Sequence, residues 1–160
     1  MKTKTLATSG IIAALYVAVS LLVAPFGFTA VQFRISEMFN HLVVFNKKFF
    51  FGIVLGVFVT NIFSPMAAYD LIFGVAHSVI SLSITIFASK FIKGHIPHMV
   101  FNTLIFTVMT FIIAFELQLA FDAPFLYTWL TVAAGEFAVL AVGIPVITAL
   151  NKRLNFKALI

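Results

Sequence analysis

The charged residues divide this sequence into long apolar runs, and that spacing constrains the fold more than any other feature. Four runs of 19 to 29 uncharged residues lie between Lys4 and Arg34, Lys48 and Asp70, Asp70 and Lys90, and Lys93 and Glu116. A helix needs about 20 apolar residues to cross a bilayer. Each run therefore predicts one membrane-spanning helix, and the region Pro124 to Leu150, interrupted only by Glu136, predicts another.

Composition excludes a soluble domain. Apolar residues make up 62% of the chain and charged residues 9%, whereas soluble domains contain about 45–50% and 25%. Mean hydropathy is +1.16. At about 20 residues per span, 160 residues hold six helices and leave no room for a second domain. We therefore expect an all-α membrane protein, a compact bundle of six transmembrane helices in one domain over residues 1–160.

The distribution of basic residues predicts the orientation. The expected helices are Thr5 to Ala24, Ile35 to Asn46, Phe49 to Phe63, Ala67 to Ser89, His98 to Leu117 and Phe125 to Leu150. Because cytoplasmic loops collect Lys and Arg, six crossings with both termini cytoplasmic put nine of the ten basic residues, Lys2 among them, on the inner side. Arg34 is the exception, and the five acids fall toward the outer ends. The short second helix must cross, since otherwise Lys47 and Lys48 would lie outside. A multi-pass membrane protein follows.

Several chemistries are excluded. The net charge of +5 would suggest nucleic acid in a soluble protein, but here the basic clusters flank apolar runs and set topology. There is no cysteine, no Gly-x-x-x-x-Gly-Lys phosphate loop and no His-Glu-x-x-His zinc motif. His95 and His98 are interpreted as interfacial polar residues. We expect no metal, no cofactor, no catalytic residues and no enzymatic activity.

Small residues form a stripe on the first helix. Gly10, Ala14 and Ala18 are spaced four apart, a pattern that admits another helix at close range. The partner could be a helix of this bundle or one of another protein.

A polar run opens the second helix. It includes Gln32, Arg34 and Glu37 and continues to Asn40 and His41. Residues 34, 37 and 41 would share one face of an α-helix. An Arg34–Glu37 ion pair would account for the two charges, but Asn40 and His41 lie deeper, where polar side chains face a cavity or the bundle interior.

Two further polar groups lie on other helices. Asn61 and Ser64-Pro65 precede Asp70 and His77, which are seven apart and so lie two turns apart on one helix face. They suit a ligand pocket, a proton relay or a hydrogen bond between helices. Glu136 stands alone in the last helix after Gly135, and a carboxylate at that depth is costly and usually functional. The polar groups converge on the outer half of the bundle, which indicates a pocket open to the outside.

These motifs resemble those of the QueT family. The resemblance is carried by the run Val31 to Glu37, by Asn61-x-x-Ser64-Pro65 followed by Asp70 to Gly74, and by Gly135-Glu136. It implies a substrate-binding (S) component of an energy-coupling-factor (ECF) transporter, associated with queuosine precursors. The implied partners are a transmembrane coupling subunit, which docks on the alanine stripe, and two cytoplasmic ATPase subunits. The implied substrate is a 7-deazaguanine such as preQ1 or preQ0, or queuine.

The polar residues suit such a substrate. A carboxylate accepts the ring N–H donors of a guanine-like base, and Glu37, Asp70 and Glu136 are the candidates. Gln32, Asn40 and Asn61 could complement the ring carbonyl, with Arg34 and His77 also in the expected site. An S component for another vitamin-like heterocycle, a proton-coupled secondary transporter and a membrane enzyme are the alternatives. The secondary transporter would require an internal repeat, and none is found.

Overall fold

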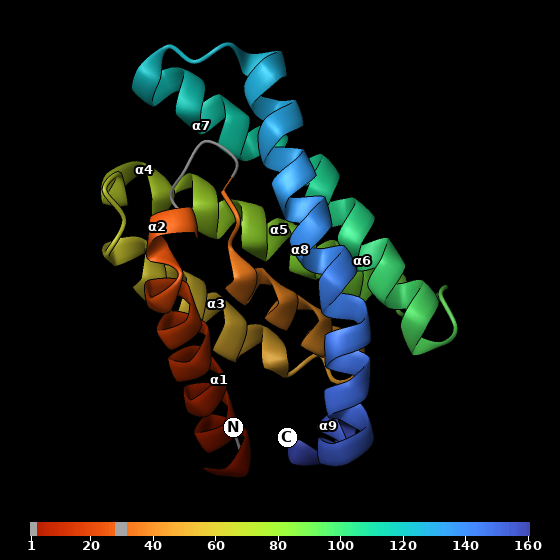
Figure 1. Ribbon diagram of the computed structural model, residues 1–160. Helices are drawn as coiled ribbons and strands as arrows, with labels where there is room; N and C mark the ends of the chain where they lie inside the picture. Colours follow the sequence, from red (N-terminus) through yellow and green to blue (C-terminus); the bar gives the residue numbers. More distant parts are fainter. Residues whose placement is uncertain (1–2, 28–31) are drawn as a thin grey trace.

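The computed structural model describes residues 3–27 and 32–160, so that Lys2 and Val31 lie outside the described residues. Every regular element in these ranges is a helix (Figure 1). In chain order they are α1 (Thr3–Leu22), α2 (Ala24–Gly27), the 3₁₀ helix η1 (Ile35–Val44), α3 (Phe49–Ile62), α4 (Ala67–Asp70), α5 (Phe73–Ala88), α6 (His95–Met109), α7 (Phe111–Phe121), α8 (Phe125–Leu154) and α9 (Phe156–Leu159).

The apolar runs form helices where the sequence predicts them. Four helical stretches are long and apolar enough to cross a membrane: Thr3–Leu22, Ala67–Ala88, His95–Phe121 and Phe125–Leu154. α3 is apolar but shorter, and η1 has only 10 residues. The structure thus confirms an all-helical fold with several membrane-length helices, while the six crossings stay a prediction.

Two of the expected helices are interrupted. The segment Ala67 to Ser89 divides into α4 and α5 at Leu71 and Ile72. The segment expected from His98 begins at His95 and divides at Thr110, whose hydroxyl donates to the Thr107 carbonyl at 2.6 Å. A hydroxyl bonded to a carbonyl of the preceding turn often accompanies a bend. α7 consequently leaves the direction of α6 and covers the end of the molecule that carries α4 (Figure 1).

Glycines allow α3 to approach α1 closely. A Cβ added at Gly52 would lie 2.8 Å from the Ser9 carbonyl oxygen, and one at Gly56 would lie 2.7 Å from the Tyr16 Cβ. Real side chains essentially never reach such distances. α1 therefore packs against α3 through its buried face, which includes Ile12 and Ala13.

The 3₁₀ helix η1 is the central element, in contact with α1, α3, α5, α6 and α8. Asn40, His41 and Leu42 are at most 1% exposed. The expected α-helical face of residues 34, 37 and 41 is wrong. A 3₁₀ helix has three residues per turn, so Asn40 stands over Glu37 and His41 points in another direction. Arg34 precedes the helix.

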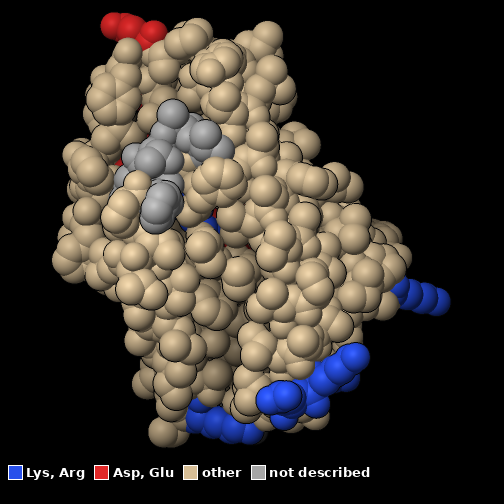
Figure 2. Space-filling model, in the orientation of Figure 1, with Lys and Arg blue, Asp and Glu red and all other residues tan. Residues whose placement is uncertain are grey.

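The two ends of the molecule differ in charge. Both termini lie at one end (Figure 1), where the Lys4 ammonium donates to the Ala158 carbonyl at 2.8 Å. Lys and Arg gather toward that end and an acidic side chain projects from the opposite end (Figure 2). Between the two ends, the surface carries exposed apolar side chains, among them Leu6, Phe51, Phe87, Leu104 and Leu130. We call the end opposite the termini the distal end.

Candidate functional site: a cavity at the distal end

A cavity of about 430 Å³ opens at the distal end. Pockets for small molecules typically measure about 300–1,000 Å³. Residues from four parts of the chain line it: Gln32 and Arg34 before η1, Ser64, Pro65, Met66 and Asp70 around α4, Leu117 and Phe121 on α7, and Ala123, Pro124, Tyr127, Thr128 and Thr131 at the start of α8. We call this space the distal cavity.

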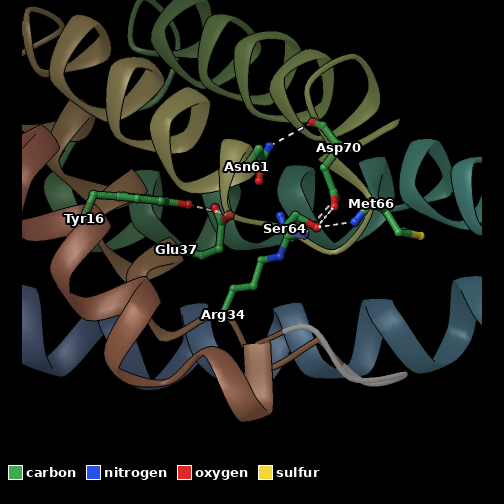
Figure 3. A network of polar contacts seen from close by, with 7 residues as sticks. All are labelled: Tyr16, Arg34, Glu37, Asn61, Ser64, Met66 and Asp70. Carbon is green, nitrogen blue, oxygen red and sulfur yellow. Dashed lines mark hydrogen bonds and ion pairs between the residues drawn. The ribbon is translucent and has the colours of Figure 1, made fainter. Parts of the chain in front are cut away.

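An ion pair forms part of its wall. The Arg34 guanidinium Nη2 lies 3.2 Å from Asp70 Oδ1, and Arg34 is 14% exposed against 2% for Asp70. The Ser64 hydroxyl donates to Asp70 Oδ2 and accepts from the Met66 amide at 3.1 Å (Figure 3). Asp70 is thus the counter-ion to which Arg34 is bonded, in place of the Arg34–Glu37 pair considered from the sequence.

Asn61 holds the backbone beside this pair. Its side-chain amide donates to the Asp70 main-chain oxygen at 2.9 Å, next to the break between α4 and α5. A Cβ at Gly74 would lie 2.7 Å from the Asn61 Nδ2. The absence of a side chain at Gly74 therefore lets Asn61 reach Asp70. This contact accounts for the glycine that follows Asp70 in the motif.

Glu37 is held by donors from two helices. The Tyr16 hydroxyl donates to Glu37 Oε1 at 2.7 Å (Figure 3), and the Asn40 side-chain amide donates to Oε2. Glu37 is 2% exposed and Tyr16 equally so. Both oxygens of this carboxylate are thus occupied within the protein, and Glu37 and Asn40 stand beside the cavity wall instead of in it.

Glu136 lies deep in α8 and keeps acceptor capacity. It is 5% exposed, and its Oε1 has no hydrogen-bond partner among the described residues. Glu37 and Arg34 act on it electrostatically. Glu136 does not line the distal cavity, but it belongs to the same group of buried charges.

Comparison with known proteins gives the family. A model of the QueT transporter family matches residues 6–152. The chain belongs to the QueT transporter family. It is 32% identical over 165 residues to the queuosine precursor transporter QueT of Lactococcus lactis subsp. cremoris (strain MG1363), with 98% of this chain and 97% of that protein covered. No solved structure matches.

Family membership, together with the apolar helices, makes this chain a multi-pass membrane transport protein. Of the eight substrate-binding residues expected from the sequence, the distal cavity of this QueT family member brings together Gln32, Arg34 and Asp70. Asn61 bonds the wall residue Asp70 but does not line the cavity itself. Glu37, Asn40 and Glu136 do not line it either.

His77 contacts other parts of this transporter. Its Nε2 lies 3.2 Å from the Phe106 carbonyl, and its ring meets Phe106 edge-on. It sits in α5, beyond the break, so it does not line the cavity with Asp70. The hydrogen bond between helices, one of the three readings of His77, describes this arrangement.

A second polar network joins η1 to α5, α6 and α8. His41 Nε2 bonds the Leu140 carbonyl at 2.9 Å, and its Nδ1 lies 3.1 Å from the Asn102 amide. Asn102 also accepts from Thr85 at 2.8 Å, and His98 Nε2 bonds the Thr85 carbonyl at 2.7 Å. His98 is therefore buried, not interfacial as expected, because α6 starts earlier and turns it inward. These bonds tie the central 3₁₀ helix to its neighbours.

Three kinds of residue at or near the site carry no clear signal in the sequence. Tyr16 lies on the buried face of α1, and only its distant partner reveals its role. Tyr127, Thr128 and Thr131 follow a loop, and no motif marked them. Glu116, on α7, was interpreted as the charged boundary of an apolar run, but it is 0% exposed.

Proposed function

We propose that this chain is the membrane-embedded, substrate-binding S component of an ECF importer and that it binds a queuosine precursor, a 7-deazaguanine such as preQ1, preQ0 or queuine, in the distal cavity. The observation that carries the proposal is the cavity itself, lined by Gln32, Arg34 and Asp70 and backed by buried carboxylates. The Lactococcus relative is named as a queuosine precursor transporter, which supports the substrate class.

The cavity offers complementary groups for a purine-like ring. Such a ring presents N–H donors on one edge and a carbonyl acceptor beside them. Buried carboxylates accept from the donors, and Gln32 or Arg34 can donate to the carbonyl. Tyr127 and Phe121 provide aromatic faces in the same lining. Asp70 is the carboxylate in the lining. Glu136 does not line the cavity, and we propose that a ligand seated deeper than the lining reaches it with its donor edge, because one Glu136 oxygen lacks a hydrogen-bond partner among the described residues.

Docking on the coupling subunit is proposed for the stripe on α1. Gly10, Ala14 and Ala18 are all exposed, and a Cβ at Gly10 would meet nothing within 4 Å. The opposite face of α1 packs on α3. The stripe is thus free to admit a helix of another protein, and ATP would be hydrolysed by two separate cytoplasmic subunits.

We further propose six crossings of the cell membrane, with the end that carries both termini in the cytoplasm. Basic residues gather toward that end, as the rule for cytoplasmic loops requires. The distal cavity would then open to the outside, where an importer collects its substrate.

Binding to the purified protein tests the substrate class. Isothermal calorimetry with preQ1, preQ0, queuine and guanine is expected to show tight binding of at least one 7-deazaguanine and weaker binding of guanine. Mass spectrometry of any ultraviolet-absorbing compound that co-purifies provides an independent readout. Binding of an unrelated vitamin, with none of the 7-deazaguanines bound, would contradict the proposal.

A further inference from the structure

Glu116 on α7 is a fully buried carboxylate whose polar neighbour is another acid. It is 0% exposed, and no amide, hydroxyl or basic group among the described residues donates to either of its oxygens. The groups that act on it are Asp70, whose carboxyl lies within side-chain hydrogen-bonding reach, and Arg34. A buried carboxylate without donors is costly, so this position calls for a donor or a cation from elsewhere.

The acids near Arg34 outnumber the cations. Glu37, Asp70, Glu116 and Glu136 are all buried, and each is close enough to Arg34 to interact with it or with an acid beside it. Glu37 has Tyr16 and Asn40 as donors. The other basic side chains in the described ranges, seven lysines and an arginine, are exposed and cannot neutralise a buried acid.

Arg34 cannot serve all these carboxylates. Its Nη2 is bonded to Asp70, whose carboxylate adjoins Glu116. Two neighbouring carboxylates repel each other unless a proton or a cation lies between them. The group is therefore short of positive charge at Glu116, which in the empty protein is satisfied only by a proton shared with Asp70.

The position of Glu116 connects this shortage to the distal cavity. Arg34 and Asp70 both line the cavity, as does Leu117, the residue after Glu116. The Glu116 carboxylate thus lies directly behind this part of the wall. A cation at the wall would reach it once the Arg34–Asp70 pair rearranges.

We infer that Glu116 is a specificity-determining residue, which pairs with a protonated amine carried by the substrate. This inference rests on the proposed function and refines it: the cavity selects 7-deazaguanines with a cationic amine on the substituent. An ammonium supplies three donors and a full positive charge, whereas a nitrile supplies neither. Glu136 would serve the ring, and Glu116 the substituent.

The test compares two ligands on the same ring, 7-aminomethyl-7-deazaguanine and 7-cyano-7-deazaguanine. Calorimetry on the wild-type protein is expected to show tighter binding of the aminomethyl compound. Glu116→Gln should weaken its binding about ten- to a hundredfold, the value of a charge-assisted hydrogen bond. Binding of the cyano compound should change less than about twofold, because its substituent has no donor for a carboxylate. Asp122→Asn, which neutralises an exposed carboxylate at the end of the same helix, is the matched control and should alter neither affinity.

Thermal unfolding of the empty variants separates recognition from structure. Glu116→Gln should unfold no earlier than wild type, because the variant amide can still donate to Asp70 while a buried carboxylate is removed. Equal weakening of both ligands by Glu116→Gln, or no preference of the wild type for the amine, would overturn the inference while leaving the proposed function standing. If neither ligand binds the wild type, the proposed function itself fails.

Discussion

At the scale of single residues, the site is a set of buried charges that differ in what satisfies them. Asp70 is bonded to Arg34 and Ser64, and Glu37 accepts hydrogen bonds from Tyr16 and Asn40. Glu136 keeps one oxygen without a described partner. A carboxylate already bonded within the protein has little to offer a ligand, whereas one with a spare acceptor gains a bond on binding. This difference ranks Glu136 above Glu37 as a recognition residue.

Glu136→Gln tests that ranking. The substitution keeps the volume but removes the charge and one acceptor oxygen, so a ring donor is left poorly paired. A hydrogen bond to a charged group contributes about 1.5–3 kcal/mol, and binding of every 7-deazaguanine should weaken about ten- to a hundredfold in calorimetry. Asp122→Asn is again the control. An unchanged dissociation constant would show that Glu136 has a structural role, and Asp70 or Glu37 would then be the candidate recognition carboxylate.

At the scale of helices, α1 uses its two faces differently. The face with Ile12 and Tyr16 is buried on α3, and the face with Ala14 and Ala18 is exposed. Close approach on the buried side depends on glycines of α3, because a side chain there would overlap α1. The small residues on the exposed side would likewise let a helix of a partner protein approach closely.

Gly56→Ala should destabilise the contact between α1 and α3. The added methyl would lie 2.7 Å from the Tyr16 Cβ, and overpacking of this kind costs about 1–3 kcal/mol. The melting temperature of the purified protein should fall. Gly10→Ala adds the same methyl to open space on α1 and should not lower it. Equal melting temperatures for the two variants would show that the contact relaxes freely.

Ala14→Trp combined with Ala18→Trp should block assembly. Bulky side chains on the stripe would hold a partner helix away, so co-purification with the coupling subunit and cellular uptake should be lost. Calorimetry should still show ligand binding, because the stripe faces away from the bundle. Leu15→Trp, at an exposed position beside the stripe, is the control. Loss of ligand binding in the double variant would assign the stripe to the bundle itself.

At the scale of the whole molecule, charge and cavity are placed at opposite ends. Basic side chains gather toward the end with the termini (Figures 1 and 2). The distal cavity is lined by residues of the other end. An apolar surface covers the middle. This arrangement suits a body that spans a bilayer and collects a ligand on the side away from its basic residues.

Single cysteines test the orientation, because the chain has no cysteine of its own. Lys93→Cys lies in the exposed connection between α5 and α6, and Ala123→Cys lies between α7 and α8. An impermeant thiol reagent added to intact cells should label position 123 and spare position 93. Permeabilised cells, in which both should react, provide the control. Labelling of position 93 in intact cells would reverse the topology.

The membrane class, the helical segments and most polar positions follow from the sequence by itself. The reason is local: a long apolar run in lipid must satisfy its backbone hydrogen bonds internally, and a helix does so within the run. Helix limits such as Phe49–Ile62 accordingly agree with the expected ones within a few residues. Arg34 and Asp70 could be named for the same reason, since a charge in an apolar run stands out without any knowledge of its partner, and Gln32 belongs to the same polar run as Arg34.

Only the tertiary structure decided which partner each polar group has. Arg34 bonds Asp70, 36 residues away, and Tyr16 bonds Glu37, 21 residues away. The second helix is 3₁₀ throughout, so residues three apart share its faces. In the sequence Glu116 marks only the boundary of an apolar run, whereas the packing of α7 buries it. Such pairings depend on how separate helices pack against one another, and this information lies in no single run of the sequence.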